Sequence, residues 1–132
     1  MKKLFFFVLI NIIYLTPVWA DSWTYVAESG SGNLTVYVDK NNIRSSGKTV
    51  VWWQLDSYKN KLKGGNLTIY STISKIEGDC FRDRQKDLYI TYYDQKMGKG
   101  NKVLDDNPPA KWIYNPPSSV WYAALRYVCE KN

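Results

Sequence analysis

Residues 50–55, with the sequence VVWWQL, decide the fold. If this stretch is a strand, Val51, Trp53 and Leu55 point to one face, and Val50, Trp52 and Gln54 point to the other. Both faces are then mostly apolar, which is typical of a strand in the middle of a sheet. The stretch therefore predicts a central strand with other parts of the protein packed over each of its sides.

The same period of two extends outward from this strand, over residues 22 to 113. Clusters of glycine and asparagine interrupt it, as expected for the turns of an antiparallel sheet. The expected strands are 22–27, 34–39, 50–55, 67 to about 76, about 80 to 93, and 102–104. The expected turns lie at 29–33, 41–47, 59–65 and 97–101. We therefore expect an antiparallel sheet of about six strands.

The end of the chain changes to a helical period. The sequence Asn-Pro-Pro-Ser at 115–118 stops a strand and offers Ser118 as the N-cap of a helix. After it, an apolar stripe is formed by Trp121, Ala124, Leu125 and Val128. A sheet followed by one amphipathic helix predicts an α+β fold in which the helix covers one face of the sheet.

The first twenty residues resemble a secretory signal peptide. A basic start at residues 1–3 precedes an apolar run at 4–15, and Val18-Trp19-Ala20 supplies small residues at the two positions needed before a cut. The run is shorter than a membrane span and is interrupted by Asn11, which disfavours an uncleaved anchor. Asp21 follows the cut, where a bacterial lipoprotein would have cysteine. We expect export without a lipid anchor, and a single domain over residues 21–132.

The two cysteines, Cys80 and Cys129, are the only pair in the chain. In an oxidising compartment a disulfide is favoured over two free thiols. Two thiolates without histidine do not complete a tetrahedral metal site unless carboxylates assist, so we expect no metal. Because Cys129 follows Leu125 by one turn, the disulfide would attach the helix to the sheet.

Composition argues against several classes of function. The chain has no histidine, which removes the commonest general base and zinc ligand, and its three glutamates lie far apart. Without Lys2 and Lys3 the mature chain has 16 basic and 12 acidic residues, a net charge of +4. That charge is too small and too dispersed for a typical nucleic-acid-binding protein. We expect no enzyme, no cofactor and no nucleic acid.

An ordered set of residues resembles the surface-adhesin protein E family over essentially the whole mature chain. Its most specific parts are Asp79-Cys80 with the following arginines, and the Pro-Pro-Ser helix that carries the second cysteine. The other parts are Trp23, Val38-Asp39 to Ile43, Val51-Trp52, residues 97–100 (MGKG) and Trp112. The resemblance implies a six-stranded antiparallel sheet tied to a C-terminal helix by a disulfide, in a bacterial envelope protein. It also implies binding to host matrix or plasma proteins.

Three groups of residues are candidates for partner binding. The first is basic and would suit heparin-like sugars or anionic lipid headgroups: Lys59, Lys61, Lys63, Lys96, Lys99 and Lys102. The alternative is two solvated lysine-rich turns, which also protect sheet edges. The second group is Arg82 and Arg84, which on a strand would point to the same face and grip a carboxylate or sulfate. The alternative is pairing with the neighbouring aspartates.

The third group is aromatic and consists of Trp52, Tyr70, Tyr92 and Tyr93. These side chains would form an exposed surface for a protein partner, although burial under the helix explains part of the set equally well. One helix covers only one face of a single sheet. The other face therefore needs a cover, for which a homodimer is the economical solution.

Two classes of function remain. One is a binding module of the adhesin E type that holds host proteins through its aromatic and basic surface. The other is a soluble periplasmic interaction or inhibitor protein without a role in adhesion, for example one that blocks lysozyme. The basic mature chain would repel a basic lysozyme, which disfavours that example. The sequence leaves open whether the exported protein stays in the periplasm or reaches the cell surface.

Overall fold

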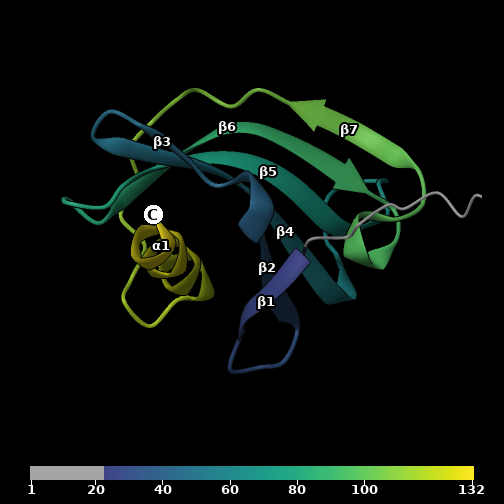
Figure 1. The fold of residues 1–132 in the computed structure, drawn as a ribbon. Helices are drawn as coiled ribbons and strands as arrows, with labels where there is room; N and C mark the ends of the chain where they lie inside the picture. Colours follow the sequence, from purple (N-terminus) through teal and green to yellow (C-terminus); the bar gives the residue numbers. More distant parts are fainter. Residues whose placement is uncertain (1–22) are drawn as a thin grey trace, which may run out of the picture.

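The computed structural model describes residues 23–132, so the predicted signal peptide lies outside the described residues. One antiparallel sheet has the strand order β1-β2-β4-β5-β6-β7, and a short strand β3 pairs with β4 beside this path. Its strands are β1 (Trp23–Glu28), β2 (Leu34–Asp39), β3 (Arg44–Ser46), β4 (Thr49–Leu62), β5 (Ile69–Asp79), β6 (Arg84–Tyr93) and β7 (Lys102–Asp106). Figure 1 shows the sheet curving around the helix α1 (Val120–Lys131). The predicted α+β class is confirmed.

The long strand β4 is central, as residues 50–55 predict. It pairs with β2 and β3 on one side and with β5 on the other. In this register Asp56 lies between Val36 of β2 and Thr72 of β5. Residues on the same side of these strands therefore form one continuous inner face, which is the face that α1 covers.

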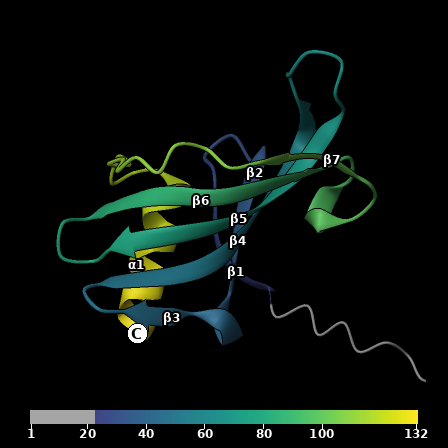
Figure 2. The same ribbon diagram turned by 90° about the horizontal axis from the view of Figure 1, so that it is seen from above.

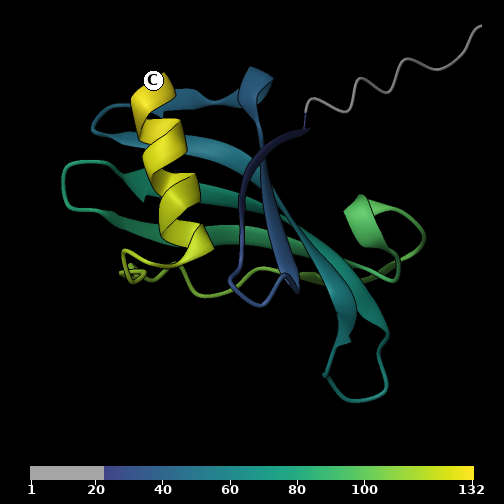
Figure 3. The same ribbon diagram turned by 90° about the horizontal axis from the view of Figure 1, so that it is seen from below.

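The main core lies between α1 and the inner face. The sheet contributes Val36, Val38, Val50 and Trp52, which have no exposed surface. From α1, the residues that pack against them are Ala124, Leu125 and Val128. At the start of the helix the buried residue is Val120, whereas the periodicity predicted Trp121. Figure 3 shows α1 lying across the sheet, with the β4–β5 hairpin projecting away from it. The N-cap of the helix is Ser119, one residue later than predicted, and its hydroxyl accepts from the Tyr122 amide at 3.1 Å.

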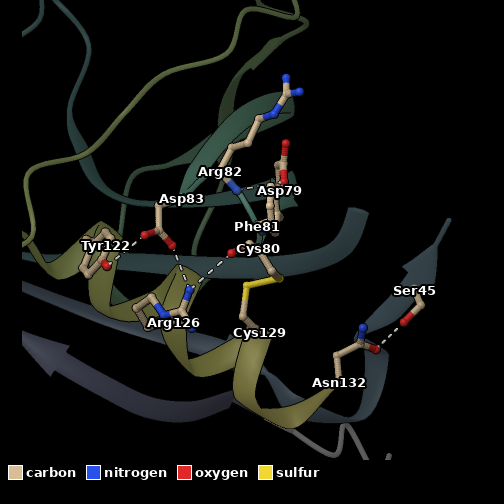
Figure 4. The surroundings of a disulfide bond; sticks show 10 residues. All are labelled: Ser45, Asp79, Cys80, Phe81, Arg82, Asp83, Tyr122, Arg126, Cys129 and Asn132. Carbon is tan, nitrogen blue, oxygen red and sulfur yellow. Dashed lines mark hydrogen bonds and ion pairs between the residues drawn. A yellow bond between two sulfur atoms is a disulfide. The ribbon is translucent and has the colours of Figure 1, made fainter. Parts of the chain in front are cut away.

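The predicted disulfide between Cys80 and Cys129 is confirmed. Figure 4 shows it joining α1 to the turn between β5 and β6. Beside it, Arg126 of α1 donates to Asp83 at 2.8 Å, and the Tyr122 hydroxyl lies 3.3 Å from the same carboxylate. The helix is therefore attached to the turn by a covalent bond and by polar contacts.

Several predicted boundaries are wrong for local reasons. The turn expected at 41–47 overlaps the 3-10 helix η1 (Lys40–Asn42) and contains strand β3. Residues 59–62 were expected in a turn but continue β4, because the Lys59 and Asn60 amides bond to Asn33. Residues 80–83 form a turn rather than the start of a strand. The Asp79 carboxylate holds this turn by accepting from the amides two and three residues further on, those of Phe81 and Arg82.

The outer face of the sheet is partly covered by the chain itself. The 3-10 helix η2 (Lys96–Gly98) lies over it, with the Met97 amide bonded to Ser57 and the Gly98 amide to Ser71. The α-carbon of Gly98, at φ +67°, sits so close to Ile73 that a side chain there would collide with it. Figure 2 shows η2 near the end of the sheet away from α1. This local cover accounts for the burial of Leu55, which therefore does not require a second subunit. The homodimer stays a prediction.

Candidate functional site

Part of the predicted basic surface comes together around Tyr70. Lys59 of β4 and the loop that carries Lys96 and Lys99 line one shallow depression with Tyr70 of β5, and its volume is about 510 Å³. The Lys96 ammonium lies 6.0 Å from the centre of the Tyr70 ring. We call this site the basic depression; Asp94, Gln95 and Met97 complete its lining.

Hydrogen bonds to the sheet position the loop of the basic depression. The Ser71 hydroxyl donates to the Gln95 carbonyl at 2.6 Å and accepts from the Gly98 amide at 2.8 Å. The Asp94 carboxylate accepts from the Asn101 amide at 2.7 Å, which closes the loop at its base. The loop lysines therefore start from a fixed backbone, which lowers the entropy cost of binding a ligand.

The other predicted lysines are not among the residues that line this depression. Lys61 and Lys63 lie further along the β4–β5 hairpin, at its projecting end. Lys102 forms an ion pair with Asp105 at 2.7 Å. Hydrogen bonds from Lys102 and from Tyr89 lower the pKa of Asp105 to about 2. The structure thus divides the predicted basic group into three parts.

For Arg84 the structure favours pairing with aspartate. Its guanidinium lies 3.1 Å from the Asp79 carboxylate and 4.4 Å from the centre of the Trp112 ring. Arg82 lies in the turn rather than on a strand, so the two arginines do not share a strand face as predicted. Both line a cavity of about 680 Å³ together with Phe81, whose side chain is 94% exposed.

The predicted aromatic surface is not formed as a unit. Trp52 is completely buried in the core, where its indole N–H donates to Gln54 at 3.2 Å, so the prediction of exposure is wrong for this residue. Tyr70 belongs to the basic depression. Tyr92 and Tyr93, being neighbours on β6, point to opposite faces of the sheet. Burial under the helix, the alternative, is correct for Trp52.

The sequence did not predict a pocket on the inner face that is lined by both polar and apolar side chains. It has a volume of about 370 Å³ and lies beside the start of α1, between the sheet and the segment that contains Ile113 and Asn115. We call it the inner pocket. Its charged lining residues are Asp56 of β4 and Asp87 of β6. A signal was present in the sequence, since Gln54 and Asp56 continue the inner face of a strand that is apolar up to Trp52.

Burial dominates the electrostatics of the inner pocket. It raises the pKa of Asp56 to about 6, against hydrogen bonds from Trp121 and Gln54 that lower it, and the Asp87 charge raises it further. Burial also raises the pKa of Asp87. The pKa of Tyr92 is raised by burial and by the charges of Asp106 and Asp87. Burial therefore disfavours the charged form of both carboxylates, and pKa shifts of this kind are typical of functional sites.

No helix among residues 23–132 is long and apolar enough to cross a membrane.

Comparison with known proteins agrees with the fold. The chain is similar to Haemophilus influenzae protein E in its crystal form II, with 17% identity, a TM-score of 0.58, and coverage of 80% of this chain and 87% of that one. It is also similar to protein E from non-typeable Haemophilus influenzae, with 14% identity, a TM-score of 0.56, and coverage of 80% and 75%. At such identities the likeness concerns the fold alone. No curated protein matches the sequence.

A family model gives the stronger assignment. The model described as surface-adhesin protein E matches residues 23–130, from the first strand to the last turn of α1. The match includes the cysteines that form the disulfide and the helix that they attach. This chain therefore belongs to the surface-adhesin protein E family.

Proposed function

We propose that the protein is an exported, non-enzymatic binding protein that attaches to host matrix or plasma proteins, and that the basic depression is its contact surface. Family membership supports adhesion as the general role. The predicted signal peptide supports export of a mature domain that begins at Asp21.

The convergence of Lys59, Lys96 and Lys99 around one tyrosine carries the proposal. Among residues 23–132 none of these three lysines forms an ion pair, in contrast to Lys102. Their charges remain available to an acidic partner, and positive potential over a concave surface speeds association with such a partner. Tyr70 adds a large apolar ring with a polar tip, a side chain that is enriched at interfaces.

Binding of the purified mature protein to immobilised matrix and plasma proteins tests this function. In the double variant Lys59→Glu/Lys96→Glu we expect binding to fall about tenfold or more, because two attractive charges become repulsive. The matched control is Lys40→Glu/Lys111→Glu, which changes the net charge equally outside the basic depression. Equal loss in both variants would show a general charge effect and contradict the proposed surface.

Location separates adhesion from a periplasmic role. We expect protease added to intact cells to cleave the protein. Cleavage only after the outer membrane has been opened would place the protein in the periplasm and contradict adhesion. The alternative function, an interaction with an envelope protein, would then be tested by pull-down from the envelope fraction.

A further inference from the structure

The inner pocket contains two carboxylates without a cation. Asp56 and Asp87 lie on strands separated by β5, and both line the pocket. Neither forms an ion pair among residues 23–132, and no lysine or arginine lines the pocket. The Asp56 residue is only 9% exposed. Buried charges in proteins are normally paired, so this arrangement leaves a positive charge to be supplied from outside.

A buried side-chain oxygen in the same pocket also lacks a partner. Gln85 is 3% exposed, and its Oε1 has no hydrogen bond within the part of the chain that the structure describes. Its main chain is fixed by two hydrogen bonds to Ile113, with N···O distances of 3.0 and 2.7 Å. Such an unpaired acceptor is costly to bury, and a ligand that donates hydrogen bonds would satisfy it.

One buried hydrogen-bond donor and the aromatic side chains that line the pocket further limit which ligands fit. Asn115 Nδ2 is buried without a partner in the described chain, so it is available to a carbonyl oxygen of a peptide ligand, an acceptor that a free alkyl amine lacks. Aromatic side chains line the pocket, namely Tyr58, Tyr92 and Trp121. Aromatic rings attract cations and also pack against aliphatic stems. The volume of about 370 Å³ lies at the small end of the range for ligand sites.

We propose that the inner pocket binds a primary ammonium group on an aliphatic stem, with Asp56 and Asp87 supplying the opposite charge and Gln85 Oε1 accepting a hydrogen bond. The ammonium group belongs either to a free small amine or to a lysine side chain of a peptide. This site is lined by different residues from the basic depression, and its test is therefore independent of the proposed adhesion.

The indole N–H of Trp121 reports directly on binding. It donates to Asp56 Oδ2 at 2.8 Å, so a cation arriving at that carboxylate changes its NMR resonance. We expect a saturable shift of this resonance when cadaverine is added to the mature protein at neutral pH. The uncharged 1,5-pentanediol, which has the same carbon chain, should cause no saturable shift. Absence of a saturable shift both with cadaverine and with the blocked lysine described below, or equal binding of the diol, would overturn the proposal.

Charge variants locate the site. Asp87→Asn should weaken cadaverine binding about tenfold or more, as expected for loss of a charged hydrogen-bond partner. Asp87 forms no ion pair in residues 23–132, so this variant should fold normally, which circular dichroism checks. Glu130→Gln removes one charge on the exposed side of α1 and should leave binding within twofold. Unchanged binding in Asp87→Asn, or an equal loss in Glu130→Gln, would refute the site.

A second titration identifies the source of the ammonium group. Lysine blocked at both ends, as Nα-acetyl-lysine N-methylamide, presents the side chain as a peptide does. Tighter binding of the blocked lysine than of cadaverine supports a peptide ligand, and the reverse order supports a free amine. A mature protein that binds neither probe contradicts the proposal.

Discussion

Replacing Asp56 with asparagine should remove the loss of stability that the wild type shows between acid and neutral pH. The carboxylate lies under α1 and accepts from Trp121 Nε1 at 2.8 Å and from Gln54 Nε2 at 2.9 Å. Burial outweighs these bonds and raises the pKa of Asp56 from 3.8 to about 6. The folded protein thus binds this proton more tightly than the unfolded chain does. The contribution of this proton to the free energy of unfolding is complete below pH 3.8 and is lost as the pH rises through about 6.

The size of the effect follows from this difference in pKa. A rise of the pKa from 3.8 to about 6 corresponds to about 3 kcal/mol in the free energy of unfolding. Asparagine is neutral at every pH, but its NH2 group cannot accept a hydrogen bond, so one of the two donors to residue 56, Trp121 Nε1 or Gln54 Nε2, loses its partner at every pH. We therefore expect the variant to be less stable than wild type at pH 3.5 by about 1–3 kcal/mol, the cost of one unpaired buried donor, and this difference to shift in favour of the variant by up to about 3 kcal/mol at pH 7.

Urea unfolding of both proteins across this pH range measures the difference. Groups that titrate in both proteins cancel when the two free energies are subtracted, including Asp105 with its lowered pKa. Asp87 is the exception, since its charge acts on Asp56 itself, and repeating the pair on an Asp87→Asn background isolates that contribution. A variant that is less stable than wild type by the same amount at both pH values would refute the reasoning. The two hydrogen bonds would then outweigh the burial of charge.

The remaining predictions concern the attachment and packing of the helix. Cys129→Ser should lower the free energy of unfolding by about 4 kcal/mol, because the disulfide closes a loop with a sequence separation of 49; equal urea midpoints without reductant would contradict this. Gly78→Ala should cost about 1–3 kcal/mol, since the new Cβ would lie 2.7 Å from Trp52; an unchanged melting temperature would show that the ring moves freely. Ser119→Ala should cost about 1 kcal/mol by thermal unfolding while Ser118→Ala costs little, and the opposite order would restore Ser118 as the cap.

Much of the fold could be predicted because its signals are local. The alternation around Trp52 placed the central strand, and the change of period after the two prolines placed the helix. These signals depend on side chains a few residues apart, which is the distance over which strand and helix periodicity act. The disulfide needed only the number of cysteines and the expectation of export. Ends of elements were less accurate, as the turn at 80–83 shows, because a side chain of the preceding strand holds that turn.

The sites depended on the tertiary structure. Asp56 and Asp87 are far apart in the sequence, and only the pairing of β4 and β6 with β5 brings them to one pocket. Lys59 and Lys96 meet because Ser57 and Ser71 hold η2 on the sheet. The sequence by itself determined the α+β class, the central strand, the final helix and the disulfide. Only the folded chain decided which polar groups lose water without gaining partners, because desolvation depends on everything packed around a group and not on its neighbours in the sequence.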